Sequence, residues 1–207
     1  MIKNVIFDCG QVMIEFNAPR MLAYLGAYGE AQDLLVRQIY QGPEWRLLDQ
    51  GVITEQQTVD AVCRRVPAEY HGVVEAFVTG WWKQPFVPIP GMEDLMRELK
   101  AAGYGLYVLS NVSDSYVKFK DRLPGIELFD GVFASSDYKL LKPEPEIYQT
   151  FLKTFSLDAA ECVFIDDVAA NVAGAERCGI RGIRFTGDTE KLKEQLWPLL
   201  GHKISII

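Results

Sequence analysis

The chain has 207 residues, of which 49% are hydrophobic and 24% are charged, and its formal net charge is −7. This composition predicts a soluble globular protein with one good core and room for a small accessory domain, and it excludes global disorder. The negative charge disfavours nucleic acid as a partner, because phosphate backbones require clustered Lys and Arg.

The sequence carries no sign of a membrane or secretory protein. No apolar run approaches the ~20 residues of a membrane span. A strand pattern starts almost at the first residue, which leaves no room for a signal peptide. The four cysteines lack metal-ligand spacing, and we expect them to be reduced and mostly in the core: Cys9, Cys63, Cys162 and Cys178. We therefore expect a cytoplasmic protein.

Short apolar runs bounded by turn residues predict buried parallel strands. In chain order they cover residues 5–7, 106–109, 132–133, 163–165 and 183–185. Helical patterns lie between these runs, at residues 91–102, 144–155 and 170–178. Strands that alternate with helices predict an α/β fold, a Rossmann-like doubly wound parallel sheet with helices on both faces.

The stretch between the first strand and the next core element is long and has helical patterning throughout. Within it, Thr54 and Gln57 have the spacing of a capping box at a helix start. The proline-rich segment 85–90 (PFVPIP) is typical of a linker that returns to the core. We predict a helical cap of residues 14–83 inserted into an α/β core of residues 1–13 and 84–207.

Acidic residues follow two of the predicted strands, where doubly wound sheets bind ligands. Asp8 follows the first strand, in VIFDCGQV, and can be a nucleophile, a metal ligand or a plain turn cap. Asp166 and Asp167 follow a later strand, in VFIDDVAAN. Adjacent buried acids repel one another unless a cation or strong donors neutralise them. Oxygen-rich sites of this kind suit Mg²⁺, so we expect a metal site.

Two further signals are suited to binding an anion. Ser110 and Asn111 end the second strand, where a hydroxyl and backbone N–H groups can hold phosphate oxygens, although a plain turn has the same pattern. Lys142 precedes Pro143 at the start of a predicted helix, and a helix N-terminus favours an anion. A single lysine is more often solvated, so this signal has an alternative interpretation.

In their order and spacing these signals resemble the four motifs of the haloacid dehalogenase-like superfamily. The motifs correspond, in order, to Asp8, Ser110, Lys142 and the pair Asp166-Asp167. The resemblance spans residues 5 to about 185, and the insert at 14–83 lies where that family has its small helical cap. Within the family, the Gly two positions after the nucleophile and the SN and KPE-x-x-IY patterns are similar to those of bacterial glucose-1-phosphate phosphatases.

The resemblance implies a Mg²⁺-dependent phosphatase that acts on small phosphate esters. It implies that Asp8 is the nucleophile and becomes an aspartyl-phosphate. It implies metal ligands at Asp8, the Gly10 carbonyl and Asp167. It implies that Asp166 holds metal-bound water and that Asn171 supports the metal site. It also implies phosphate-binding groups at Ser110, Asn111 and Lys142. Such a site accelerates phosphoryl transfer by positioning the phosphoryl group and neutralising its charge.

One position departs from the family pattern. Gly10 stands where most phosphatases of this superfamily carry a second Asp as general acid and base. A missing general acid costs ~10²–10⁴ in rate. Glu15 could replace it, but we favour an exposed charge at the linker. Aromatic residues of the cap could line a sugar pocket, although cap core is the favoured interpretation: Tyr40, Trp45, Trp81 and Trp82.

Two alternatives to a phosphatase remain. Haloacid dehalogenases also lack the second Asp, but their attack needs no metal and would leave the pair Asp166-Asp167 without a role. A non-catalytic binding protein on a decayed enzyme scaffold would fit Gly10, whereas the intact Asp8 and Lys142 argue against it. The phosphatase is therefore the preferred hypothesis.

Overall fold

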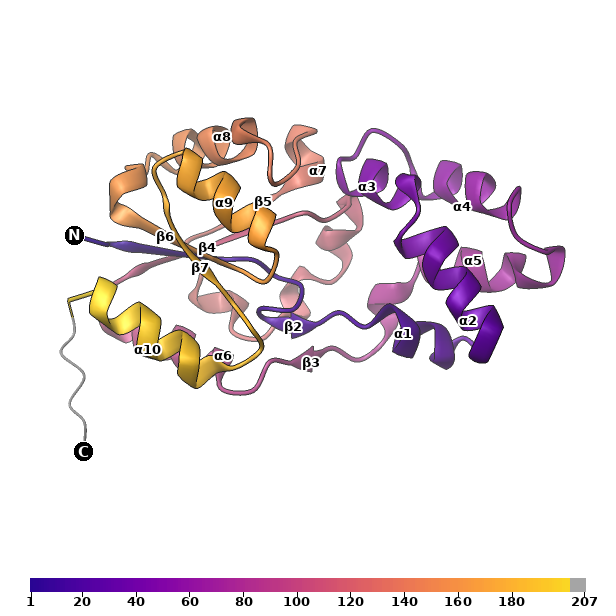
Figure 1. The fold of residues 1–207 in the computed structure, drawn as a ribbon, viewed down its shortest axis with the longest axis horizontal. Helices are drawn as coiled ribbons and strands as arrows, with labels where there is room; N and C mark the ends of the chain where they lie inside the picture. The colour runs from indigo at the N-terminus through magenta and orange to yellow at the C-terminus, as the bar shows by residue number, and fades with distance from the viewer. Residues whose placement is uncertain (202–207) are drawn as a thin grey trace.

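The computed structural model describes residues 1–201, and its centre is a parallel sheet of five strands (Figure 1). The strand order is β5-β4-β1-β6-β7, with every neighbouring pair parallel. The bounds are β1 Asn4–Phe7, β4 Gly105–Ser110, β5 Gly131–Ala134, β6 Cys162–Asp166 and β7 Arg181–Arg184. The predicted α/β fold is confirmed. β7 begins two residues before the predicted run, because its first residues, Arg181 and Gly182, have no apolar side chain to signal a strand.

Helices cover both faces of the sheet. The long ones are α6 Met92–Ala101, α8 Pro145–Phe155, α9 Ala169–Arg177 and α10 Thr189–Leu199. Successive side chains of β1 point to opposite faces. Val5 packs in one core with Leu95 of α6 and Leu192 of α10, whereas Ile6 packs in another with Phe151 of α8. Figure 1 shows the two helix pairs on opposite sides of the strands. The three predicted helices are confirmed to within one residue at each end.

The insert after β1 is helical, as predicted. Its elements are α1 Ala18–Tyr24, α2 Gly29–Leu35, the π-helical η1 Val36–Tyr40, α3 Pro43–Asp49, α4 Glu55–Cys63, η2 Ala68–Tyr70, α5 His71–Val78 and η3 Trp81–Lys83. The capping box at α4 is confirmed, because Thr54 Oγ1 accepts the Gln57 N–H at 3.1 Å and Gln57 Oε1 accepts the Thr54 N–H at 2.8 Å. These helices gather at the end of the sheet toward which β1 runs (Figure 1).

The chain leaves and re-enters the sheet region along a short two-stranded ribbon. β2 Ile14–Glu15 pairs antiparallel with β3 Val87–Pro88. The segment 85–90 is therefore a linker that also contributes a strand, and Pro88 is tolerated because the pairing is only two residues long. The cap boundaries 14 and 83 stay a prediction. Short elements complete the described chain: η4 Asp114–Lys118, η5 Lys120–Arg122, η6 Ile126–Leu128, α7 Ser135–Tyr138 and η7 Ala159–Glu161.

All four cysteines are free thiols. Within residues 1–201, no helix combines the length and the apolar character needed to cross a bilayer.

Candidate active site

The candidate site lies at the carboxyl ends of the central strands. The chain runs outward from β1 through β4 to β5 and then returns to the other side of β1 with β6, so the direction of winding switches between β1 and β6. Ligands of doubly wound sheets bind in the crevice at such a switch point. Asp8 follows β1, and Asp166 is the last residue of β6. The topology therefore brings both acids to the same crevice.

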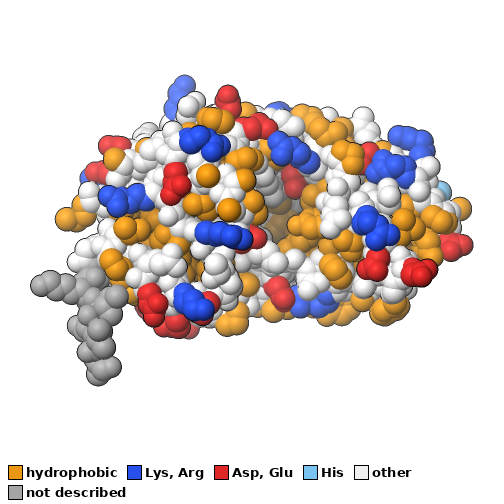
Figure 2. Space-filling view, in the orientation of Figure 1, with side chains coloured by type: hydrophobic (Ala, Val, Ile, Leu, Met, Phe, Trp, Pro, Cys, Tyr) orange, Lys and Arg blue, Asp and Glu red, His pale blue; other side chains and the backbone are white. Residues whose placement is uncertain are grey.

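A cavity of about 430 Å³ occupies this position, and Figure 2 shows the surface hollowed between the sheet and the helical insert. Seven of the eight predicted site residues line it: Asp8, Gly10, Ser110, Asn111, Lys142, Asp167 and Asn171. The eighth, Asp166, is fully buried against Lys142 and Asn171. The structure thus gathers every predicted site residue in one place.

Lys142 is the central cation of the site. Its Nζ lies 2.7 Å from Asp8 Oδ1 and 2.7 Å from Asp166 Oδ2, and it donates to the Leu109 carbonyl at 3.0 Å. The residue is 2% exposed. The interpretation of Lys142 as a solvated lysine is therefore wrong, because all three of its N–H donors are used inside the protein.

The charged groups of this cluster shift one another's pKa values. Burial raises the pKa of Asp8 to about 6, and the neighbouring Asp166 adds to this effect, while Lys142 opposes it. Burial lowers the pKa of Lys142, but the two carboxylates outweigh burial and the net shift is upward. Lys142 therefore stays cationic, and one positive charge faces two buried carboxyl groups.

Asp166 is held by the protein itself. Asn171 Nδ2 donates to its two carboxylate oxygens at 3.1 and 3.0 Å, and the Val168 N–H donates at 2.8 Å. With Lys142, these donors satisfy the buried carboxylate without a metal. The adjacency of Asp166 and Asp167 therefore does not by itself demand a metal ion, contrary to the expectation from sequence. The case for a metal depends on Asp167 and Asp8.

Asp167 is half-buried, lines the cavity and forms no ion pair with any residue in the described part of the chain. Burial raises its pKa, and Asp166 adds to the rise. Carboxylate oxygens of Asp8, Asp166 and Asp167 lie within 4.8 Å of one another. A set of oxygen donors without His or Cys suits a hard cation such as Mg²⁺, and a bound cation would relieve the repulsion that raises these pKa values. The residues present therefore fit the ion.

The two polar residues after β4 differ in what they contact. The Ser110 hydroxyl faces the cavity and has no hydrogen-bond partner among residues 1–201. The Asn111 side chain instead holds the backbone of Lys142, because it donates to the Lys142 carbonyl at 3.1 Å and accepts the Lys142 N–H at 2.9 Å. Ser110 is thus free to donate to a ligand, and Asn111 fixes the position of the lysine.

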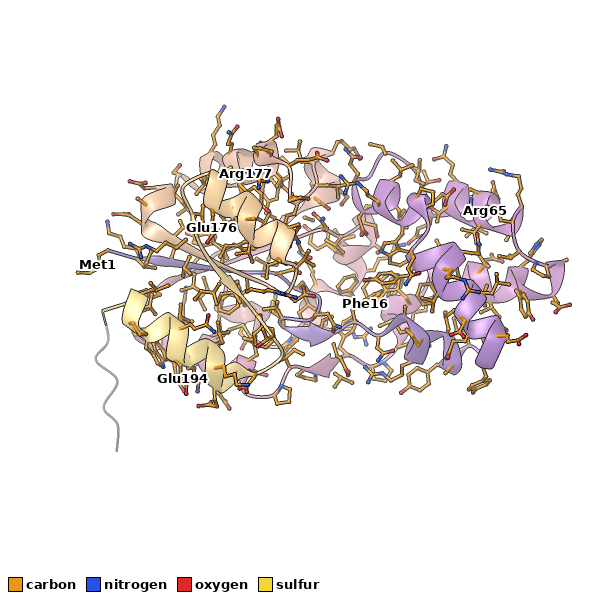
Figure 3. All side chains as sticks on the ribbon, viewed as in Figure 1. Met1, Phe16, Arg65, Glu176, Arg177 and Glu194 are labelled. Carbon is orange, nitrogen blue, oxygen red and sulfur yellow. The ribbon has the colours of Figure 1, made fainter. Side chains whose placement is uncertain are left out.

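Aromatic side chains of the helical insert also line the cavity. Tyr40, Trp45 and Trp81 line the cavity, as considered from the sequence, whereas Trp82 does not. Phe16 joins them, with its ring centroid 5.1 Å from those of Tyr40 and Trp81. Figure 3 shows Phe16 between the sheet and the helical insert. These rings give the cavity one apolar wall, and Phe16 was not predicted because no motif marks it.

Of two further acidic residues near the site, only one lines the cavity. Glu15 does not line the cavity, and its carboxylate pairs with Arg20 at 2.7 Å. Asp49, at the end of α3, does line the cavity. The sequence offered no signal for Asp49, because its place in the cavity depends on how α3 packs in the folded chain.

Comparisons with known proteins identify the family of the chain. Residues 2–179 match the haloacid dehalogenase-like hydrolase family. The chain is similar to sesquiterpene phosphatase astK of Aspergillus oryzae, with 27% identity over 89% of this chain and 90% of the relative. It is similar to (S)-2-haloacid dehalogenase 4A of Burkholderia cepacia, with 23% identity over 99% and 97% of the two chains. Its fold matches the Bacteroides thetaiotaomicron family enzyme BT-2542, solved with magnesium and inorganic phosphate, at a TM-score of 0.68, 22% identity and coverages of 93% and 99%.

Proposed function

The chain belongs to the haloacid dehalogenase-like hydrolases, and from that premise we propose that it is a Mg²⁺-dependent phosphatase of small phosphate monoesters. One observation carries the proposal. A single cavity contains the Asp8 carboxylate, the Lys142 ammonium in contact with it, and the Asp167 carboxylate, which has no ion pair among residues 1–201. This combination provides a nucleophile, a cation for the phosphoryl oxygens and a second metal ligand.

In the proposed reaction Asp8 attacks phosphorus, the bond to the leaving oxygen breaks, and an aspartyl-phosphate forms. Lys142 exchanges its contact with Asp8 for one with a phosphoryl oxygen, while its bonds to Asp166 and Leu109 hold it in place. Ser110 donates its free hydroxyl to a second phosphoryl oxygen. Fixed donors of this kind stabilise charge that develops in the transition state.

The ion would be held by Asp8, Asp167 and the Gly10 carbonyl, with Asp166 acting through water and Asn171 supporting that acid. It would neutralise negative charge on the phosphoryl group when bound. Asp166 suits an indirect role, because its oxygens are already occupied by protein donors.

We propose sugar phosphates as the substrate class, in particular sugar 1-phosphates. The aromatic wall formed by Phe16, Tyr40, Trp45 and Trp81 can stack on the apolar face of a sugar. The pattern around Gly10 is similar to that of bacterial glucose-1-phosphate phosphatases, and a hemiacetal oxygen leaves more easily than a primary alcohol. The cap of residues 14–83 would supply this wall. The four free thiols suit a reducing compartment, so we place the enzyme in the cytoplasm.

The test is a screen for phosphate release with Mg²⁺ and with EDTA, over sugar 1-phosphates, the matching 6-phosphates and aryl phosphates. A parallel assay measures halide release from 2-chloropropionate, and Asp8→Asn is the control for both. We expect phosphate release that requires Mg²⁺ and is lost in Asp8→Asn. Metal-independent halide release without phosphatase activity would establish the dehalogenase alternative. Ligand binding without either reaction would favour the non-catalytic alternative.

A further inference from the structure

Departure of an alkoxide from phosphorus is slow unless a positioned acid gives it a proton. Gly10 has no side chain to do so. Three carboxylates of the described chain line the cavity: Asp8, Asp49 and Asp167. Asp8 is the nucleophile and Asp167 a metal ligand of the proposed function. Asp49 is the one that has no assigned role.

Asp49 lies at the end of α3, and several hydrogen bonds join this end of the helix to the core. The backbone N–H of Ser113 lies near the Asp49 carboxylate and lowers its pKa. The Ser135 hydroxyl donates to the Asp49 carbonyl, and Gln50 Nε2 donates to the Lys139 carbonyl at 3.0 Å. Lys139 Nζ in turn donates to the Gly51 carbonyl. These contacts hold the end of α3 over the site, so the position of Asp49 is set by both parts of the molecule.

We propose that Asp49 is the catalytic acid and base of this chain, an inference that rests on the proposed phosphatase function. In the first step Asp8 forms a bond to phosphorus, and the leaving oxygen takes the electron pair of the broken P–O bond together with the proton of Asp49. In the second step a water molecule attacks phosphorus and gives its proton to the Asp49 carboxylate. The bond between phosphorus and Asp8 breaks, which releases phosphate and restores both carboxyl groups.

The surroundings of Asp49 suit this role. Burial raises the pKa of Asp49 well above its ordinary value, and the charge of Asp8 adds to the rise, while the Ser113 N–H and Lys142 oppose it. A raised pKa favours the protonated form of a carboxyl group, which is the form that can donate a proton. The Tyr40 phenol and the Cys9 thiol also line the cavity. They are weaker proton donors than a carboxyl group, because burial raises the pKa of both.

The test compares Asp49→Asn with wild type on phosphate esters whose leaving groups differ in acidity. Asn keeps the size of the side chain and an oxygen for the Ser113 N–H, but it cannot transfer the proton. We expect kcat/KM to fall by ~10²–10⁴ for sugar and alkyl phosphates. The fall should be much smaller for 4-nitrophenyl phosphate, whose leaving group needs no proton. Because the second step loses its base, phosphorylated Asp49→Asn should accumulate with this substrate and be visible in the intact mass.

Glu15→Gln is the matched control. Glu15 is also an acid within residues 14–83, but it does not line the cavity, so we expect this variant to behave as wild type. An equal loss for all leaving groups, or a selective loss in Glu15→Gln, would overturn the assignment of Asp49. Should Asp49→Asn fail to fold, Asp49→Ser serves the same comparison. Wild type that releases no phosphate from any ester would defeat the proposed function and this inference together. If wild type is active and Asp49→Asn loses activity equally for all leaving groups, only this inference fails.

Discussion

At the scale of single residues, the site is dominated by a charge imbalance. Lys142 contacts Asp8 and Asp166 at 2.7 Å each, and all three residues are less than a tenth exposed. Desolvation of buried charges is costly, and removal of one partner leaves the others uncompensated. We therefore expect Lys142 to contribute to the stability of the fold as well as to the proposed chemistry, and the two contributions can be measured separately.

Lys142→Met should abolish most activity and destabilise the protein by about 3–5 kcal/mol, because it leaves Asp8 and Asp166 buried without their cation. Urea unfolding in EDTA measures the loss. Lys153→Met is the matched control, since Lys153 is exposed on α8, and its stability should stay within ~0.5 kcal/mol of wild type. If Lys142→Met were as stable as Lys153→Met, the buried cluster would not have the energetic role that its geometry indicates.

Asp8→Asn should have the opposite effect on stability. The pKa of Asp8 rises from 3.8 to about 6 on folding. As pH increases, the unfolded chain loses this proton first, so native stability falls between these two pH values and stays lower above them. Each pKa unit corresponds to 1.36 kcal/mol, so removal of the charge should stabilise the metal-free protein by up to about 3 kcal/mol at pH 7.5. Urea midpoints at pH 7.5 and pH 4 check this, and the gain should shrink at pH 4. A variant less stable than wild type at pH 7.5 would contradict it.

At the scale of secondary-structure elements, helices α8 and α9 fix the acidic side of the site. Asn171, in the first turn of α9, holds Asp166, and Tyr148 of α8 donates to the Asn171 carbonyl at 2.7 Å. The two helices approach closely at Gly174. A Cβ atom there would lie 2.7 Å from the Pro143 carbonyl and 2.9 Å from the Tyr148 hydroxyl. The glycine is needed for this packing, and hence for the position of Asn171.

Gly174→Ala should therefore destabilise the protein by about 1–3 kcal/mol, because overpacking forces the helices apart. It should also lower kcat, since the start of α9 carries Asn171. Gly72→Ala in α5 is the control: a Cβ there meets nothing within 4 Å, and helix propensity predicts a gain of about 0.5–1 kcal/mol. Thermal unfolding and phosphate release measure both variants. Equal stability of the two would show that α8 and α9 have room to adjust.

The same elements explain which features the sequence could predict. The central strands β1, β4 and β6 were recognisable because both faces of the sheet are covered, so each contains an unbroken apolar run. Asp8, Ser110 and Asp167 were recognisable because the carboxyl ends of parallel strands meet at one edge. Asp49 and Phe16 were not, because their distance from Asp8 depends on how the helical insert packs, and that packing leaves no periodic signal. The burial of Lys142 was also hidden, since burial of a lysine follows from its partners.

At the scale of the whole molecule, the cavity is built by two parts of the chain, which share one hydrophobic core and are also joined at the surface. Exposed ion pairs bridge them, Arg46 with Glu144 at 2.7 Å and Lys118 with Glu55 at 3.2 Å. Such pairs are worth about 0–1 kcal/mol each. Arg65 lies at the far end of the insert (Figure 3) and pairs within it, with Glu44. A ligand that contacts both walls of the cavity would therefore add substantially to the coupling between the parts.

We accordingly expect Mg²⁺ and inorganic phosphate together to raise Tm by more than the sum of their separate effects. A ligand at 100 times its Kd stabilises the native state by ~2.7 kcal/mol, which corresponds to roughly 5–10 °C for a chain of this size. Hydrogen exchange should slow in residues 43–51, because α3 lies against the cavity with Asp49, Trp45 and Arg46 in its lining. Asp167→Asn should lose most of this synergy, since it removes a proposed metal ligand without disturbing Lys142. Additive shifts, or synergy that survives in Asp167→Asn, would place the metal and the phosphate at separate sites.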